Sequence, residues 1–172
     1  MALYLATPLR KHRRAWKWFR KEFLRAGKKH IPGSGDKKTY GAFLRSCRRF
    51  ASEATVPEGR VPASKFFLME EGGTKILGII DIRHRLNDYL LNNPGGHIGY
   101  AVAPSERRTG YGTRQLRLAL EICREMGLDR VLVTCNKANA ASARVIQKNG
   151  GVLEDERPDK DGLVFQRYWI EL

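Results

Sequence analysis

Apolar side chains in the first third of the chain recur with the spacing of helices. After a short predicted strand at residues 2–6 (ALYLA), a helix is predicted from Lys11 to Ala26 and a second from Lys38 to Ala54. The connection between them, from Ile31 to Asp36, contains Pro and Gly residues that break helices. The side chains expected to be buried are Trp16, Phe19, Phe23 and Ala26 in the first helix and Tyr40, Phe43, Leu44, Cys47 and Phe50 in the second.

The remaining two thirds of the chain have the pattern of strands interrupted by two helices. Strands are predicted at residues 65–70 and 75–83, joined by a hairpin turn at 71–74, and at 97–102 and 130–135. Helices are predicted at 113–126 and 138–148, and final strands at 152–155 and 163–170. The strand–helix–strand unit from His97 to Cys135 implies a right-handed parallel crossover. With antiparallel pairing elsewhere, the predicted fold class is α/β, a mixed sheet with helices packed on it.

The size and composition of the chain suit one folded domain. It has 172 residues, of which 42% are hydrophobic. All apolar runs are shorter than the roughly 20 residues of a membrane-spanning helix, so no membrane partner is expected. The apolar N-terminal residues precede the first charges, the reverse of a secretory signal. Cys47, Cys123 and Cys135 lack metal-type spacing, so we expect reduced thiols, a cytoplasmic protein and no metal site.

The net charge of +14 is concentrated in the first third of the chain. Residues 1–65 contain 17 Lys and Arg against 4 Asp and Glu, whereas residues 66–172 contain 15 against 14. Such a region can attract an acidic acceptor, RNA or a negatively charged surface, and it disfavours a cationic acceptor. His12 and Trp18 interleave with the charges, but no RNA-binding signature accompanies them. A solvated face that keeps the protein soluble is the alternative.

The most informative segment runs from Gly96 to Gly112 (GHIGYAVAPSERRTGYG) and has the pattern of a strand, a turn and a glycine-flanked loop that opens a helix. Its glycines let backbone N–H groups converge on an anion, and the helix N-terminus adds its dipole. A Rossmann site is disfavoured because Gln115 occupies the third glycine position, and a P-loop is excluded because Gly-Lys-Ser/Thr is absent. A plain glycine turn before a core helix is the remaining alternative.

A second element lies at the next strand-to-helix junction, where Asn136, Asn139 and Ser142 precede a helix stop at Lys148–Gly151. Together with Val102-x-Pro104 and Arg107-x-x-Gly110-x-Gly112, this element resembles the GCN5-related N-acetyltransferase (GNAT) superfamily over residues 96–153. Shorter segments (GGHIGY, PSER, LVTC, RYWI) resemble a branch of predicted acetyltransferases whose acceptors are unassigned. The resemblance implies a single GNAT domain over residues 1–172, with a mostly antiparallel sheet, a central parallel strand pair and about four flanking helices.

The resemblance also implies acetyl-CoA as the acetyl donor and direct transfer to a primary amine. The pantetheine arm would pair with the backbone around Val102 and Ala103. The other cofactor-binding residues that it implies are Arg107, Arg108, Thr109, Gly110, Tyr111, Gly112 and Thr113 at the loop, and Asn139 and Ser142 beyond it. Residues 1–62 would form a basic helical region on the acceptor side, and residues 96–153 the acetyl-CoA-binding core.

Several side chains are candidates for catalysis. His97 is the first candidate for a general base, because it lies on the strand before the loop and imidazole titrates near neutral pH; Glu106 is the second. A histidine satisfied by hydrogen bonds of the sheet is the alternative. The resemblance places Ile146 at the position of the tyrosine that protonates the CoA sulfur in many family members. Tyr168 is a candidate substitute, with a core side chain as the alternative for Tyr168 and water as the alternative source of the proton. Cys135 invites a covalent mechanism, although buried cysteine usually acts as a small hydrophobic residue.

The acceptor is expected to be a small molecule or a peptide amine, and an acidic acceptor would suit the charge. Residues 83–89 (RHRLNDY) either line its pocket or form a solvated loop. The leading prediction is an N-acetyltransferase that acts as a monomer or homodimer. The alternative is a GNAT-like module that binds CoA, a polyanion or RNA with little turnover.

Overall fold

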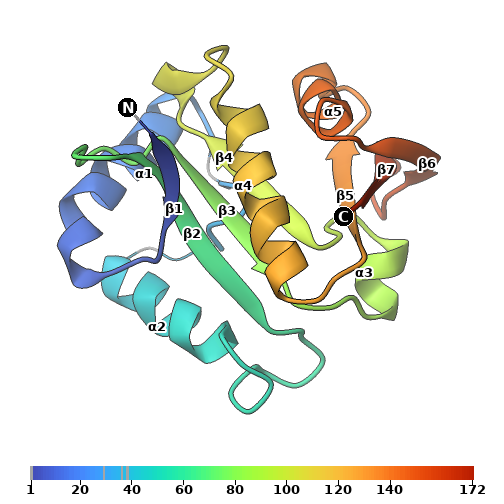
Figure 1. Ribbon diagram of the computed structural model, residues 1–172, viewed down its shortest axis with the longest axis horizontal. Coiled ribbons are helices and arrows are strands. Elements are labelled where there is room, and N and C mark those ends of the chain that lie inside the picture. Colours follow the sequence, from blue (N-terminus) through green and yellow to red (C-terminus); the bar gives the residue numbers. More distant parts are fainter. Residues whose placement is uncertain (1, 29, 36, 38) are drawn as a thin grey trace.

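A single sheet runs through the middle of the molecule (Figure 1). The computed structural model describes residues 2–28, 30–35, 37 and 39–172. Within these residues the seven strands follow the order β1-β2-β3-β4-β5-β7-β6, and β4 with β5 is the one parallel pair. The strands are β1 Leu3–Ala6, β2 Ala63–Glu70, β3 Gly78–Arg83, β4 Ile98–Val102, β5 Arg130–Asn136, β6 Val152–Pro158 and β7 Val164–Glu171.

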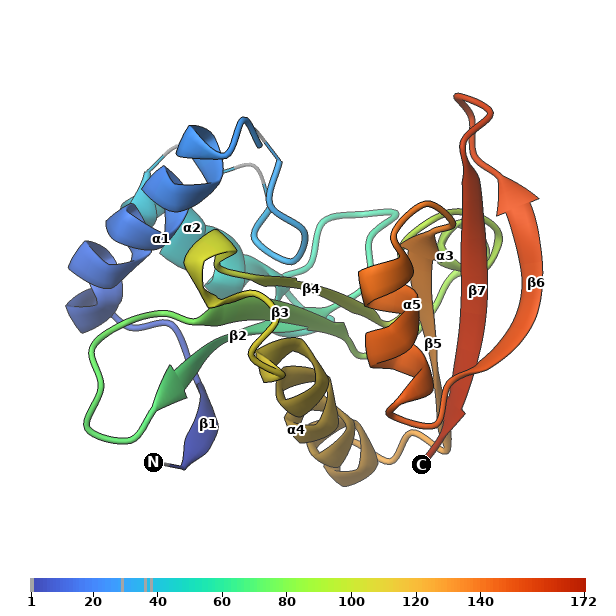
Figure 2. The ribbon, with the colours of Figure 1, turned by 90° about the horizontal axis from the view of Figure 1, so that it is seen from above.

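Helices cover both faces of the sheet. Figure 2 shows α1 and α2 on one side of β2, β3 and β4, and α4 on the other. The helices in the described residues are α1 Arg13–Arg25, α2 Tyr40–Phe50, α3 Asp88–Asn92, α4 Tyr111–Glu125 and α5 Ala140–Gln147, with short 3-10 turns at Arg10–His12 and Pro104–Glu106. The predicted mixed sheet with a central parallel pair is therefore confirmed.

Two hydrophobic cores hold these layers together. On one face, Trp16 and Phe19 of α1 and Phe43 of α2 pack against Phe67 and Ile79 of the sheet. On the other face, the core consists of side chains from β3, β4, α4, β5, α5 and β7, namely Ile80, Ile82, Ile98, Leu116, Ala119, Leu120, Cys123, Val131, Val133, Cys135, Ile146, Tyr168 and Ile170. The apolar stripes predicted for α1, α2 and α4 supply the helix side of these cores, and the strands supply most of the other buried residues.

The structure differs from the predicted pattern at a few positions. Ala26, predicted to be buried, is exposed because α1 ends one residue earlier and Ala26 is its C-cap. Lys38, the predicted start of the second helix, lies outside the described residues, and α2 begins at Tyr40, capped by Thr39. Residues 88–92 form α3, although residues 83–89 were predicted as a loop and no helix was predicted there. The side chain of Asn87 caps the first turn of α3.

Candidate active site

The parallel strands β4 and β5 pair over a very short length and then separate. Their register contains the single pair Ile98 and Val133, preceded by a 2.7 Å hydrogen bond from the His97 N–H to the Leu132 carbonyl. Figure 2 shows the two strands running in clearly different directions. Beyond Ile98, the edge of β4 that faces β5 is therefore open along its backbone.

The hydrogen-bond register decides which residues of β4 present backbone groups to this opening. Ala103 donates its N–H to the Leu77 carbonyl at 2.8 Å and accepts the Glu106 N–H at 2.9 Å. Alternate residues of a strand form hydrogen bonds to the same neighbouring strand, so the N–H and C=O groups of Ala101 also point to β3. Tyr100 and Val102 point theirs toward β5. Of the two residues predicted to pair with pantetheine, Val102 has backbone groups directed at the opening, whereas those of Ala103 are already engaged.

The glycine loop ends in an array of unpaired backbone N–H groups. Gly110, with φ of +85°, is the N-cap of α4, and Arg108 also has a positive φ of +66°. The first intrahelical bond runs from the Arg114 N–H to the Gly110 carbonyl at 3.1 Å. The N–H groups of residues 111–113 therefore have no partner within the helix. Together with the helix dipole, they form a favourable site for a phosphate group.

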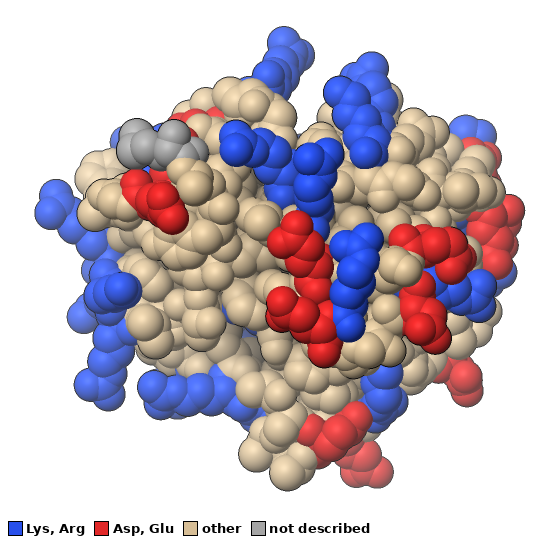
Figure 3. Space-filling view, viewed as in Figure 1, with Lys and Arg blue, Asp and Glu red and all other residues tan. Residues whose placement is uncertain are grey.

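Gly112 serves close packing at this helix terminus. A Cβ atom there would lie 3.3 Å from Val145 Cγ2 and 3.6 Å from Val102 Cγ2. The missing side chain therefore lets the first turn of α4 lie close to both α5 and β4. In Figure 3, Lys and Arg side chains gather over the beginning of α4 and beside α5. The surroundings of the N–H array are thus positively charged.

Several side chains of the loop are engaged within the protein. The Arg107 guanidinium lies over the Phe23 ring of α1, 5.7 Å from its centroid. The Tyr111 hydroxyl donates to Glu70 Oε1 at 2.9 Å, and Thr109 Oγ1 donates to the Glu106 carbonyl at 2.6 Å. Arg108 is exposed. Tyr111 and Thr109 therefore hold the loop in shape, and Arg108 is the side chain most open to a ligand.

Asn139 and Ser142 meet at the first turn of α5. Asn139 is the N-cap, and its Oδ1 accepts the Ser142 N–H at 3.2 Å. Ser142 Oγ lies 2.9 Å from the Tyr100 hydroxyl of β4. The structure thus brings both predicted residues to the opening between β4 and β5, and joins them to a tyrosine that the sequence analysis did not single out. Burial raises the pKa of Tyr100 to about 12, so its hydroxyl stays protonated at neutral pH.

A cavity of about 1060 Å³ reaches from this opening to the face covered by α2 and α3. Tyr100, Cys135, Asn139 and Ser142 line one end of it. The opposite part is lined by the loop between α1 and α2, by α2 itself and by residues around α3, including Arg83, Asn87 and Tyr89. The segment at 83–89 therefore does contribute to a pocket.

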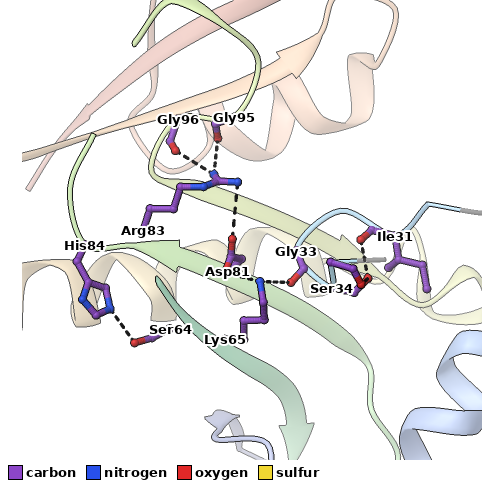
Figure 4. Close-up of polar contacts among 11 residues, drawn as sticks. Ile31, Gly33, Ser34, Ser64, Lys65, Asp81, Arg83, His84, Gly95 and Gly96 are labelled. Carbon is purple, nitrogen blue, oxygen red and sulfur yellow. Dashed lines mark hydrogen bonds and ion pairs between the residues drawn. The ribbon is translucent and has the colours of Figure 1, made fainter. Parts of the chain in front are cut away.

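Charged side chains of β2 and β3 form the floor of that cavity (Figure 4). Lys65 Nζ donates to Asp81 Oδ1 at 2.6 Å and to the Gly33 carbonyl at 3.1 Å. Arg83 lies 3.7 Å from Asp81 Oδ2 and donates from Nη1 to the carbonyls of Gly95 and Gly96. The side chains of Lys65 and Asp81 are only 10% and 8% exposed. Each of these charges therefore has a partner of opposite sign or a backbone carbonyl, which offsets the cost of removing it from water.

His97 does not have the geometry of a general base. Its side chain is 5% exposed, lies outside the residues that line the cavity, and accepts the Leu132 N–H on Nδ1 at 2.9 Å. Burial, with a smaller effect of Arg83, lowers its pKa to about 4. The imidazole is therefore neutral, and its free lone pair is already used by the sheet. The alternative, a histidine satisfied by hydrogen bonds of the sheet, describes its position.

The other catalytic candidates also have definite places. The Glu106 carboxylate forms an ion pair with Lys75 at the surface. Ile146 is fully buried in the core, and the Tyr168 hydroxyl donates to Gln166 Oε1 at 2.9 Å from a side chain that is 2% exposed. Cys135 lines the cavity, but burial raises the pKa of its thiol, which disfavours a thiolate nucleophile.

The sequence analysis missed Tyr100, Lys65 and Asp81. Alternation along β4 could have indicated Tyr100, because it lies on the same face as Ile98 and Val102. Lys65 and Asp81 are charged residues inside apolar strands, a pattern that signals either a buried ion pair or a functional site. Their partnership depends on strand register, which the sequence alone does not fix.

Two further observations concern metal ions and membranes. Among the described residues, His, Cys, Asp and Glu side chains form no group of three or more that could hold a metal ion. None of the helices described is both long and apolar enough to pass through a membrane.

Comparison with known proteins agrees with this fold. Residues 4–152 match the family model described as "Acetyltransferase (GNAT) domain". The chain therefore belongs to the GNAT acetyltransferase family.

This chain is similar to a curated relative of Arabidopsis thaliana, GCN5-related N-acetyltransferase 6, chloroplastic. The two are 30% identical over 71% of this chain, and the match spans only 36% of the relative's length. RimL, the ribosomal L7/L12 alpha-N-protein acetyltransferase, was solved with coenzyme A and matches this chain with a TM-score of 0.74 at 13% sequence identity. The match covers 100% of this chain and 95% of RimL. YncA from Salmonella typhimurium, solved with acetyl-CoA, has a TM-score of 0.64 at 16% identity and 100% and 95% coverage.

Proposed function

We propose that this protein transfers the acetyl group of acetyl-CoA directly to a primary amine. The observation that carries the proposal is the open edge of β4, which lies between the N–H array of α4 and the cavity floored by Lys65, Asp81 and Arg83. An extended donor molecule can thus lie along one side of the sheet and an acceptor on the other, meeting where β4 and β5 separate. The coenzyme supplies an activated thioester, whose acyl group an amine can attack.

The residues around α4 fit the phosphate end of such a donor. The N–H groups of residues 111–113 and the exposed Arg108 would hold the pyrophosphate, and Gly110 gives the loop its left-handed turn. Arg107 and Thr109 would act through the backbone and the shape of the loop. Val102 offers its backbone to the pantetheine arm, while Ala103 supports it from within the sheet. Asn139 positions Ser142 at the far end of the arm.

Two hydroxyl groups can stabilise the departing sulfur. Tyr100 and Ser142 are hydrogen-bonded to each other at 2.9 Å and line the cavity where the strands separate. A protonated hydroxyl there can donate a hydrogen bond to a thiolate as negative charge develops. Tyr100 and Ser142 therefore take the place of the tyrosine that is absent at Ile146.

The acceptor side favours an amine that also carries negative charge. Lys37, Arg60, Lys65 and Arg83 line the cavity, and Asp81 is the one carboxylate among its described lining residues. The net positive field would attract an acidic peptide or an anionic small molecule and oppose a polycation. RimL, by its name, acetylates the α-amino group of a protein, which makes a peptide N-terminus a reasonable acceptor to test.

Three free cysteines suit a reducing compartment such as the cytoplasm.

An acceptor screen tests the proposal. Purified protein is incubated with acetyl-CoA and a panel of amines that contains neutral, acidic and basic peptides, amino acids and polyamines. Acetylated products are identified by mass spectrometry, which avoids interference from the protein's own thiols. We expect amine-dependent product, highest with acidic acceptors. Binding of CoA without product from any amine would instead favour a CoA-binding module with little turnover.

A further inference from the structure

A second cavity, of about 830 Å³, lies between α1 and α2 and is strongly basic. Its described lining residues include five cationic side chains and no acidic one, namely Arg10, Arg13, Lys17, Arg20 and Lys21. We call this the α1–α2 groove. The helix α2 contributes to both cavities. Tyr40 and Leu44 line this groove, whereas Ser46 and Phe50 line the cavity floored by Lys65, Asp81 and Arg83, which we call the acceptor cavity.

Most of this positive charge is not neutralised within the protein. Among the described residues, Arg13, Lys17 and Lys21 form no ion pair. The one acidic residue of α1, Glu22, is turned to the loop before α4, where its Oε2 accepts a hydrogen bond from Ser105 Oγ at 2.8 Å. In Figure 3, Lys and Arg side chains project along the left edge of the molecule, over α1 and α2.

The arrangement of charges also costs the helix stability. Arg13 and Lys17, and Lys17 and Lys21, are like-charged pairs four residues apart, which destabilise a helix. The first turn of α1 contains Arg13 and Arg14 and no acidic residue, so its charges oppose the helix dipole. A face that served solubility alone would mix both signs, as residues 66–172 do. The cost would be offset when an anionic ligand occupies the groove.

The side chains around the groove favour a nucleic-acid strand over other anionic partners. Trp18 is 54% exposed, and the Lys21 ammonium lies 5.3 Å from its ring centroid. An exposed indole beside Lys and Arg is suited to stacking a base next to a bound phosphate. A membrane is disfavoured, because the apolar face of α1, with Phe19 and Phe23, is packed in the core and cannot insert into lipid.

We propose that the α1–α2 groove binds the backbone of single-stranded RNA, with Trp18 as a stacking platform beside it. This site is separate from the acetyl-transfer site, although α2 borders both.

The test is fluorescence anisotropy of a labelled single-stranded RNA oligonucleotide over a series of KCl concentrations. With about four phosphates neutralised, log K should fall with log salt at a slope of about −3. The doubly substituted Lys17→Glu/Lys21→Glu protein should lose at least about tenfold in affinity, because repulsion replaces two contacts. Trp18→Ala should lose about fivefold or more through lost stacking.

A matched variant distinguishes the loss of contacts in the groove from the effect of a lower net charge. Arg117→Glu/Arg124→Glu changes the same net charge on exposed positions of α4 and should alter RNA affinity less than about threefold. Equal losses in both double variants would overturn the proposal. Polyglutamate or anionic phospholipid vesicles that bind the groove as tightly as RNA at equal salt would overturn it too. Circular dichroism shows that each variant is folded, and calorimetry with acetyl-CoA on the same proteins separates this result from the acetyl-transfer proposal.

Discussion

The Tyr100 hydroxyl lies 2.9 Å from Ser142 Oγ and joins β4 to the first turn of α5 across the opening between the parallel strands. This bond spans 42 positions of the chain, and both of its residues line the acceptor cavity. It places two hydroxyl groups where β4 presents its unpaired edge. It is the basis of our proposal that these two hydroxyl groups act in place of the tyrosine that is absent at Ile146.

Removing either hydroxyl should slow the chemical step. We expect Tyr100→Phe and Ser142→Ala each to lower kcat about 10- to 100-fold, because the developing sulfur charge loses a hydrogen-bond donor. The KM for acetyl-CoA should change little, since the phosphate site at α4 is untouched. Steady-state kinetics measures both. A fall in kcat/KM caused by KM alone would show that the pair only helps to bind the substrate.

His97 should affect stability, not the pH dependence of catalysis. Its pKa is lowered from 6.5 to about 4 in the folded protein, so the unfolded chain binds more protons between these values. The stability that neutral His97 contributes is present above pH 6.5 and is lost as the pH falls toward 4. Comparing wild type with His97→Gln by urea unfolding should show a difference of about 2–3 kcal/mol that shrinks over this range.

The kinetic part of that prediction is independent of stability. In His97→Gln, the pH profile of kcat should keep the apparent pKa values of the wild type. A profile that loses its acidic limb, where the rate rises with pH as a base is deprotonated, would return His97 to the role of general base.

Asp81 should be essential for the floor of the acceptor cavity. In Asp81→Asn, the buried Lys65 ammonium loses its 2.6 Å partner, and we expect a loss of about 3–5 kcal/mol in the free energy of unfolding. The double variant Lys65→Met/Asp81→Asn should recover much of this loss, because no buried ammonium is left without its carboxylate and Arg83 keeps its hydrogen bonds to the Gly95 and Gly96 carbonyls. Urea unfolding of the two variants measures the difference. Equal stability of both would mean that the ion pair is not coupled to folding.

Cys135 should be dispensable for the reaction. The residue is 7% exposed, and burial raises the pKa of its thiol, which disfavours the thiolate that an acyl-cysteine intermediate requires. Cys135→Ala should retain kcat within about threefold, a change typical of a small packing defect. Complete loss of turnover, with normal binding of acetyl-CoA, would support a covalent intermediate.

Sequence patterns predicted the elements of this protein better than their contacts. The stripe of Leu116 and Leu120 predicted α4, and the glycines before it predicted the N–H array, because both depend on local periodicity and backbone conformation. The role of His97 could not be inferred in this way. It is adjacent to the loop in sequence, but its ring is bound to the N–H of Leu132, 35 positions away. Partnerships of that kind depend on tertiary register, as does the pairing of Tyr100 with Ser142.

Binding of acetyl-CoA to two glycine variants of α4 tests the central claim most directly. Gly110 and Gly127 flank this helix, with φ of +85° and +78°, and an added Cβ would meet no atom within 4 Å at either position. Valine should strain the backbone similarly at both, but only Gly110→Val distorts the N–H array. By isothermal titration calorimetry, we expect Gly110→Val to weaken binding of acetyl-CoA at least about tenfold, equivalent to the loss of one or two charge-assisted hydrogen bonds, and Gly127→Val to bind like wild type. No binding by the wild type, or equal affinity in all three proteins, would contradict the account.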